Sequence, residues 1–174
     1  MMSLHVAFLM YCGVFGIVGG MRGWAKEILV LFSMVLALFL NTIIVQFVPG
    51  VDTTLAAQAP RAQFFVRAAF FVLLAFFGYE SPAISSVLGG KARRERLQDT
   101  LLGVVLGLVN GYLLIGTLWH YLDVAQYPML GIIPPEEGSV AANYLNFLPP
   151  RVIGVPHIYF AVGLAFVFVI VVFI

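Results

Sequence analysis

Charged residues are scarce in this chain of 174 residues, since Asp, Glu, Lys and Arg together make up only 10% of it. A soluble domain needs about 25% charged residues to cover its surface, so a soluble globular protein is excluded. The formal net charge of +1 supplies no argument for a nucleic-acid partner, and we expect none. The single cysteine, Cys12, excludes a disulfide within the chain and gives no information on the redox compartment.

Catalytic signatures are also missing. The sequence contains no G-x-S-x-G, no H-E-x-x-H, no Walker glycine loop and no dinucleotide fingerprint. No pair of aspartates lies within one apolar run, because Asp99 and Asp123 flank the same run at opposite ends. We therefore predict a protein that is not an enzyme and has no catalytic residue.

Long apolar runs take the place of these features, and 62% of the residues are hydrophobic. A membrane-spanning helix needs about 20 apolar residues, and each span must be helical because a lone strand leaves its backbone polar groups unpaired in lipid. Five runs qualify, at about residues 4–21, 28–48, 64–88, 100–122 and 156–174. The sequence thus predicts an all-α, polytopic membrane bundle with four core transmembrane helices and a fifth at the C-terminus.

The chain divides into three parts. We expect the first run to be a permanent span, because no basic residue precedes it and no A-x-A cleavage site follows it. Residues 123–155 carry five prolines that oppose a long helix: Pro128, Pro134, Pro135, Pro149 and Pro150. The predicted parts are a four-helix membrane domain over 1–122, a proline-rich outer segment over 123–155 and a terminal helix over 156–174.

The basic residues predict the orientation. Of the nine, six lie in the first and third connections: Arg22, Lys26, Lys91, Arg93, Arg94 and Arg96. The positive-inside rule places the basic turns 22–27 and 89–99 in the cytoplasm, the N-terminus outside and the C-terminus inside. We expect the charges of the first turn, in GGMRGWAKEIL, mainly to hold that turn at the membrane interface.

Small residues recur at intervals of four in the fourth run, at Gly103, Gly107 and Gly111. At about 100° per residue they form one narrow stripe on a helix, and Asn110 shares that face. The first run offers a similar surface at Gly13, Gly16 and Gly20. Glycines allow close helix packing, either within the chain or against another subunit, and Asn110 would add about 0.6–2 kcal/mol if it bonded across helices.

Two ionisable residues, Arg67 and Glu80, belong to the third run. At about 1.5 Å per residue they lie roughly 20 Å apart along the axis, so they cannot pair within one helix. Arg67 is near the outer end and can extend its head group to the interface. Because a charge at the bilayer centre costs at least about 2.5 kcal/mol, Glu80 either begins an interfacial segment that runs into the basic turn or has a proton or ion role.

The three histidines, His5, His120 and His157, fall at the outer ends of three different runs. Three histidines on one side could bind a metal, a haem or a pigment, but no short ligand spacing supports such a site. We predict interface-facing histidines, no metal and no cofactor, and we leave open whether lipid or pigment fills gaps between the helices.

Two segments resemble the colicin V production protein (CvpA) family over about residues 5–122. RGWAKEIL is similar to the family's R-G-x-x-x-E-x-L turn, and DTLLGVVLGLVNGYLL to its D-x-x-L-G-x-x-x-G-x-x-x-G stretch. The matching residues are Arg22, Gly23, Glu27, Asp99, Gly103, Gly107 and Gly111. The chain departs from the pattern at Asn110, where the family often has Arg, and adds the proline-rich segment and the fifth run.

The resemblance implies a bacterial inner-membrane protein without an established biochemical activity, linked to colicin export and envelope maintenance. We expect such a protein to act by packing with membrane partners. Two other classes stay open. An accessory subunit of a large respiratory or photosynthetic complex would suit the fifth run and the proline-rich segment. A small channel or transporter would need more buried polar groups than these runs provide.

Overall fold

The protein is built from four long helices, as a computed structural model that describes residues 3–79, 96–129 and 131–173 shows. The helices are α1 (Leu4–Arg22), α2 (Trp24–Phe47), α4 (Pro60–Tyr79) and α6 (Arg96–Val124). Each is long and apolar enough to cross a membrane. No strand occurs in the described ranges, so the predicted all-α membrane bundle is confirmed.

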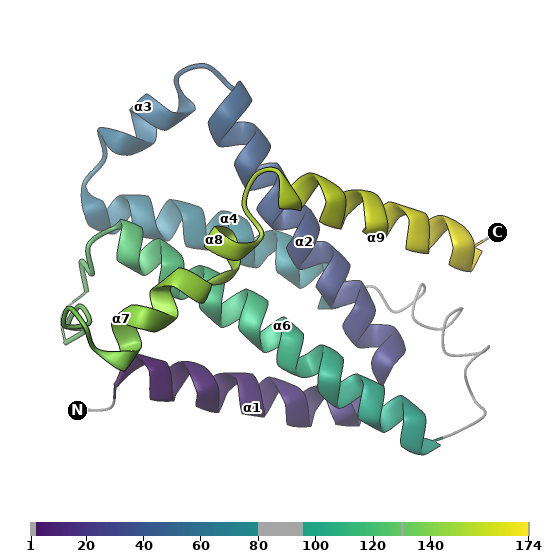
Figure 1. The fold of residues 1–174 in the computed structure, drawn as a ribbon. Helices are drawn as coiled ribbons and strands as arrows, with labels where there is room; N and C mark the ends of the chain where they lie inside the picture. Colours follow the sequence, from purple (N-terminus) through teal and green to yellow (C-terminus); the bar gives the residue numbers. More distant parts are fainter. Residues whose placement is uncertain (1–2, 80–95, 130, 174) are drawn as a thin grey trace.

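The fifth apolar run forms α9 (His157–Phe173). Its 17 residues extend about 26 Å at 1.5 Å per residue, slightly less than the typical hydrocarbon thickness of about 30 Å. Figure 1 shows α9 lying over α2 and running toward the end of the bundle where α1 meets α2. Its role as a fifth span stays a prediction.

The long helices run lengthwise and define two ends of the bundle (Figure 1). The "N-terminal end" carries the chain start and the short helices α3 (Val51–Ala56), α7 (Val140–Tyr144) and α8 (Pro149–Val152). The "Gly23 end" carries the connection between α1 and α2. Contacts are most extensive between α1 and α6, followed by those of α2 with α4 and α6.

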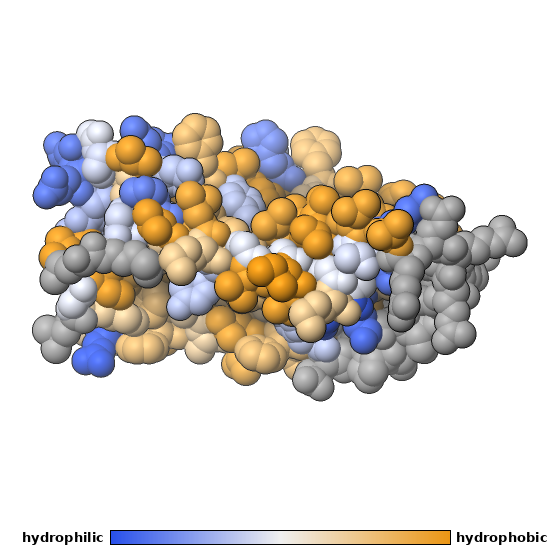
Figure 2. All heavy atoms as spheres, turned by 90° about the horizontal axis from the view of Figure 1, so that it is seen from below, coloured by the Kyte–Doolittle hydropathy of each residue, from blue (hydrophilic) through white to orange (hydrophobic). Residues whose placement is uncertain are grey.

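Apolar side chains cover the middle of the molecule. On the face drawn in Figure 2, hydrophobic residues extend across the central part and hydrophilic residues gather at the N-terminal end. The most exposed large apolar residues of α1 include Ile17 at 67% and Met21 at 83%. An exposed apolar surface of this kind is suited to lipid.

The proline-rich segment folds into short pieces, as its prolines predict. It contains α7, the 3₁₀ turn Leu145–Phe147 and α8, and it packs directly on the long helices. Tyr112 donates a hydrogen bond of 2.6 Å from its hydroxyl to the carbonyl oxygen of Phe147. Leu148 is 1% exposed and belongs to a core cluster with Phe8 and Trp119.

The helix bounds differ from the prediction. The second helix begins at Trp24 instead of Ile28, so the charged residues of the first turn lie within helices. The third helix, α4, begins at Pro60 instead of Phe64, and the structure describes the third run only as far as Tyr79. Glu80 and most of the basic turn 89–99 lie outside the described residues.

Candidate functional site

The contact between α1 and α6 is made backbone to backbone. A Cβ built on Gly107 would lie 3.0 Å from the Cα of Gly19 and closer still to the carbonyl oxygen of Phe15. A Cβ on Gly111 would lie 2.9 Å from the Cα of Cys12, and one on Gly103 would lie 3.0 Å from the carbonyl carbon of Gly19. The glycine stripe of the fourth run therefore lies against α1 within the chain.

The matching surface of α1 differs in part from the predicted one. Gly16 and Gly20 face Leu108 and Val104 of α6, each with the side chain less than 3 Å from an added Cβ. Gly13 is wrong as a packing residue, because nothing lies within 4 Å of an added Cβ. Gly19, which lies outside the predicted packing surface, makes the closest backbone approach of α1 instead.

One residue connects α1 to α2. Gly23 has φ 85 and ψ 158, a positive-φ conformation that glycine adopts readily and that strains other residues. A Cβ at this position would also lie 2.8 Å from Oδ1 of Asp99. That same oxygen accepts a hydrogen bond of 3.0 Å from the backbone N–H of Trp24, at the start of α2. Asp99 thus caps α2 from a helix that begins 72 residues later in the chain, so this turn depends on both residues.

We expect Asp99→Ala to lower the free energy of unfolding by about 0.5–2 kcal/mol, as for other lost helix caps. The matched control is Asp52→Ala, because Asp52 is exposed in the short helix α3, and it should change stability by no more than about 0.5 kcal/mol. Thermal unfolding in detergent, followed by circular dichroism, measures both. Equal midpoints for the two variants would contradict the capping role.

A charge pair with a buried carboxylate lies just beneath this turn. Glu27 is 1% exposed, and its Oε1 lies 2.7 Å from Nη1 of Arg22. Asn110 of α6 donates from Nδ2 to the other carboxylate oxygen of Glu27 at 2.7 Å and to its backbone oxygen at 2.9 Å. The guanidinium of Arg22 also lies over the ring of Tyr79, 4.4 Å from its centroid. Residues of all four long helices therefore meet at this site.

Helix dipoles explain why this pair suits its position. Arg22 lies in the last turn of α1 and Glu27 in the first turn of α2, where a positive and a negative charge are respectively favoured. The expectation that the charges of this turn mainly hold it at the interface is wrong for Glu27, because its carboxylate is enclosed. Only Lys26 remains exposed as expected.

These residues coincide with the sequence pattern that suggested a family. The family model described as colicin V production protein matches residues 4–134. The chain belongs to the colicin V production protein family. No curated protein and no solved structure shows a significant match.

The match to the family covers the four long helices and the first part of the proline-rich segment, whereas α7, α8 and α9 lie beyond the matched residues. The family residues Arg22, Gly23, Glu27 and Asp99 all meet at the Gly23 end. Asn110, where this chain departs from the pattern, donates a hydrogen bond to the carboxylate of Glu27. The two family segments thus meet at one place in the fold, although they are far apart in the sequence.

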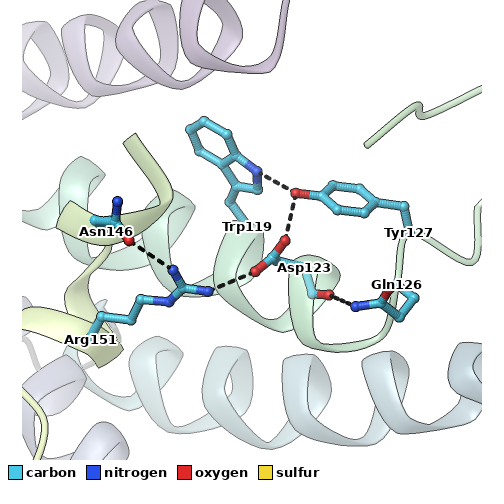
Figure 3. A network of polar contacts seen from close by, with 6 residues as sticks. All are labelled: Trp119, Asp123, Gln126, Tyr127, Asn146 and Arg151. Atoms are coloured by element: carbon cyan, nitrogen blue, oxygen red, sulfur yellow. Dashed lines mark hydrogen bonds and ion pairs between the residues drawn. The ribbon is translucent and has the colours of Figure 1, made fainter. Parts of the chain in front are cut away.

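A second polar network joins α6 to the proline-rich segment at the N-terminal end (Figure 3). Oδ2 of Asp123 accepts from Arg151 at 3.0 Å, and Oδ1 accepts from the hydroxyl of Tyr127 at 3.1 Å. Trp119 donates from Nε1 to that hydroxyl at 3.2 Å. Burial raises the pKa of Tyr127 to about 12, so the phenol stays protonated and can donate to Asp123 at neutral pH.

The three histidines lie in different surroundings. His5 hydrogen bonds Ser3 at 2.6 Å and stacks on Tyr144, with ring centroids 5.9 Å apart, while His157 is exposed. His120 lies on α6 and its Nδ1 is buried without a partner. Within the described ranges no three His, Cys, Asp or Glu side chains are grouped closely enough to hold a metal ion.

Proposed function

We propose that this membrane protein is a non-enzymatic scaffold of the bacterial inner membrane, which packs against other membrane proteins in envelope maintenance or export. Family membership and the four apolar helices support this localisation. The observation that carries the proposal is the internal pairing of the buried charge: Glu27 is bound by Arg22 and Asn110 at 1% exposure. A carboxylate held in this way stabilises a bundle and is not free to react.

The surfaces between the helices support the same conclusion. A groove between α1, α4 and α6 has a volume of about 320 Å³ and is lined by apolar side chains together with Tyr79. A second groove, between α2, α4 and α9, has about 230 Å³ and includes only one hydroxyl residue, Ser33. A solute path normally needs convergent polar groups at the membrane midplane, whereas apolar grooves suit acyl chains or partner helices.

Co-purification tests the proposed role. The full chain with an affinity tag is extracted from its native membrane in a mild detergent, and the recovered proteins are quantified by mass spectrometry. We expect stoichiometric recovery with membrane proteins of the envelope or of an export system, or a homo-oligomer. Stoichiometric recovery with cofactor-bearing subunits would instead support an accessory subunit of a respiratory or photosynthetic complex. Recovery as a monomer under all mild conditions would contradict the scaffold.

We further propose that the Gly23 end faces the cytoplasm, because Arg22 and Lys26 lie there. In a Cys12→Ala background, a membrane-impermeant maleimide should label Gln126→Cys in intact cells. Lys26→Cys should react only after the inner membrane is permeabilised. Both positions are exposed, so accessibility to the reagent is matched. The reverse pattern would contradict the orientation.

A further inference from the structure

Unpartnered polar atoms gather near the N-terminal end of the bundle, between α4 and α6. The described residues include six side chains with a buried nitrogen or oxygen that has no hydrogen-bond partner, and four belong to these two helices at this end. The atoms are Arg67 Nε, Thr117 Oγ1, His120 Nδ1 and Tyr121 OH. Buried polar atoms are paired with protein or ordered water in the great majority of cases, so four such atoms together mark a place where a ligand or water completes the hydrogen bonding.

The four side chains share one location. Thr117, His120 and Tyr121 are three and four positions apart, so they project from the same side of α6. The guanidinium of Arg67 is close enough to His120 and Tyr121 to act on both electrostatically. Phe71, one turn after Arg67 on α4, meets the ring of Tyr121 edge-on with centroids 6.2 Å apart. This contact fixes the two helices side by side at this point.

Two residues of the site are fully buried and two are partly exposed. Thr117 is 0% and Tyr121 3% exposed, so their hydroxyls face the interior. Arg67 and His120 are only partly buried and leave access from the membrane surface. Arg67 was expected to extend its head group to the interface; its Nε is enclosed, while the residue as a whole is only partly buried.

The charge at this site is positive and uncompensated. Among the described residues, Arg67 has neither an ion pair nor a hydrogen bond, whereas Arg22 and Arg151 each pair with a carboxylate. Asp123, the acidic side chain that also acts on His120, is already bound by Arg151 and Tyr127. A guanidinium and two hydroxyls can all donate, and planar guanidinium matches the oxygens of phosphate. We propose that Arg67, Thr117, His120 and Tyr121 bind the phosphate group of an anionic ligand.

Depth in the membrane is compatible with two sources of that phosphate. Arg67 follows the start of α4 by seven residues, which places it about 10 Å along the helix. The headgroup layers extend roughly 5–8 Å beyond the hydrocarbon core on each side. The phosphate of a lipid headgroup can therefore reach the cluster from the leaflet, and a free phosphate can enter it from the aqueous side.

Thermal unfolding of the full chain, purified in maltoside detergent and depleted of lipid, tests the site. The midpoint is measured with phosphatidylglycerol against diacylglycerol of the same acyl chains, and with sodium phosphate against sodium chloride at equal ionic strength. We expect a phosphate-specific rise of about 5–10 °C when the ligand exceeds its Kd by about 100-fold. A rise with phosphatidylglycerol alone identifies a lipid headgroup, and a rise with both identifies phosphate in general.

Variants make the test decisive. Arg67→Gln should abolish the rise, whereas Arg61→Gln should keep it, because Arg61 is an exposed arginine in the first turn of the same helix. If Arg67→Gln does not fold, Tyr121→Phe and Thr117→Val remove only the hydroxyl donors and should each weaken binding about tenfold. The site is refuted if neither phosphate source exceeds its matched control. It is equally refuted if the folded Arg67, Tyr121 and Thr117 variants gain as much as the natural protein.

Discussion

Gly107→Leu is expected to lower the unfolding midpoint by about 6–12 °C and to reduce the yield of folded protein in detergent. A Cβ at position 107 would meet the backbone of Phe15 and Gly19, which cannot move aside as a side chain can. Overpacking costs about 1–3 kcal/mol where neighbours can adjust and more where they cannot. At about 2–4 °C per kcal/mol for a chain of this size, a loss of about 3 kcal/mol gives the stated shift.

The control for this prediction is Gly13→Leu. Gly13 lies on α1, and nothing is within 4 Å of an added Cβ. Leucine is favoured over glycine in a helix by about 0.8 kcal/mol, so this variant should be as stable as the natural protein or slightly more so. Circular dichroism melting in the same detergent compares the two. A similar loss at both positions would mean that any glycine replacement perturbs the bundle, and it would contradict the specific contact of α1 with α6.

Hydropathy alone predicts the long helices, because the length of each apolar run is set by the membrane. It does not predict the helix ends at Gly23. The charges from Arg22 to Glu27 resemble those of a loop, yet the two helices are separated by a single glycine. The end of α1 and the start of α2 depend on the φ of Gly23 and on a cap from Asp99. A cap supplied by a distant helix leaves no local pattern in the sequence.

Only part of the candidate site could be predicted from the sequence. The spacing of the glycines in α6 marks a packing face, but the choice among the glycines of α1 depends on how the helices cross. Their axes bring Gly19 to the contact and turn Gly13 away from it. The bond from Asn110 to Glu27 joins residues 83 positions apart. No periodicity reports such a pair, whereas a charge on an otherwise apolar helix is the signal that could have suggested burial of Glu27.

The charge pair at the Gly23 end predicts an asymmetric response to mutation. In Arg22→Met, the Glu27 carboxylate remains at 1% exposure and keeps only the Asn110 amide as a partner. Removing one partner and leaving the other charge buried lowers the free energy of unfolding by about 3–5 kcal/mol, so we expect this variant to be severely destabilised. In Glu27→Gln, Arg22 can keep its position over Tyr79 and extend toward water, since its side chain is 23% exposed. That change should cost about 1–2 kcal/mol, close to one lost charge-assisted hydrogen bond.

The double variant Arg22→Met with Glu27→Gln separates pairing from simple packing. Because it leaves no unpaired charge in the interior, it should recover about 2–3 kcal/mol relative to Arg22→Met alone. The side-chain amide introduced by Glu27→Gln still presents an oxygen to Asn110 in place of the carboxylate. Lys26→Met, one residue away and exposed, is the control for loss of a positive charge and should melt like the natural protein. Additive losses for the two single changes would mean that Glu27 and Arg22 stabilise the bundle independently, and the four-helix junction at this site would then depend on packing and not on its ion pair.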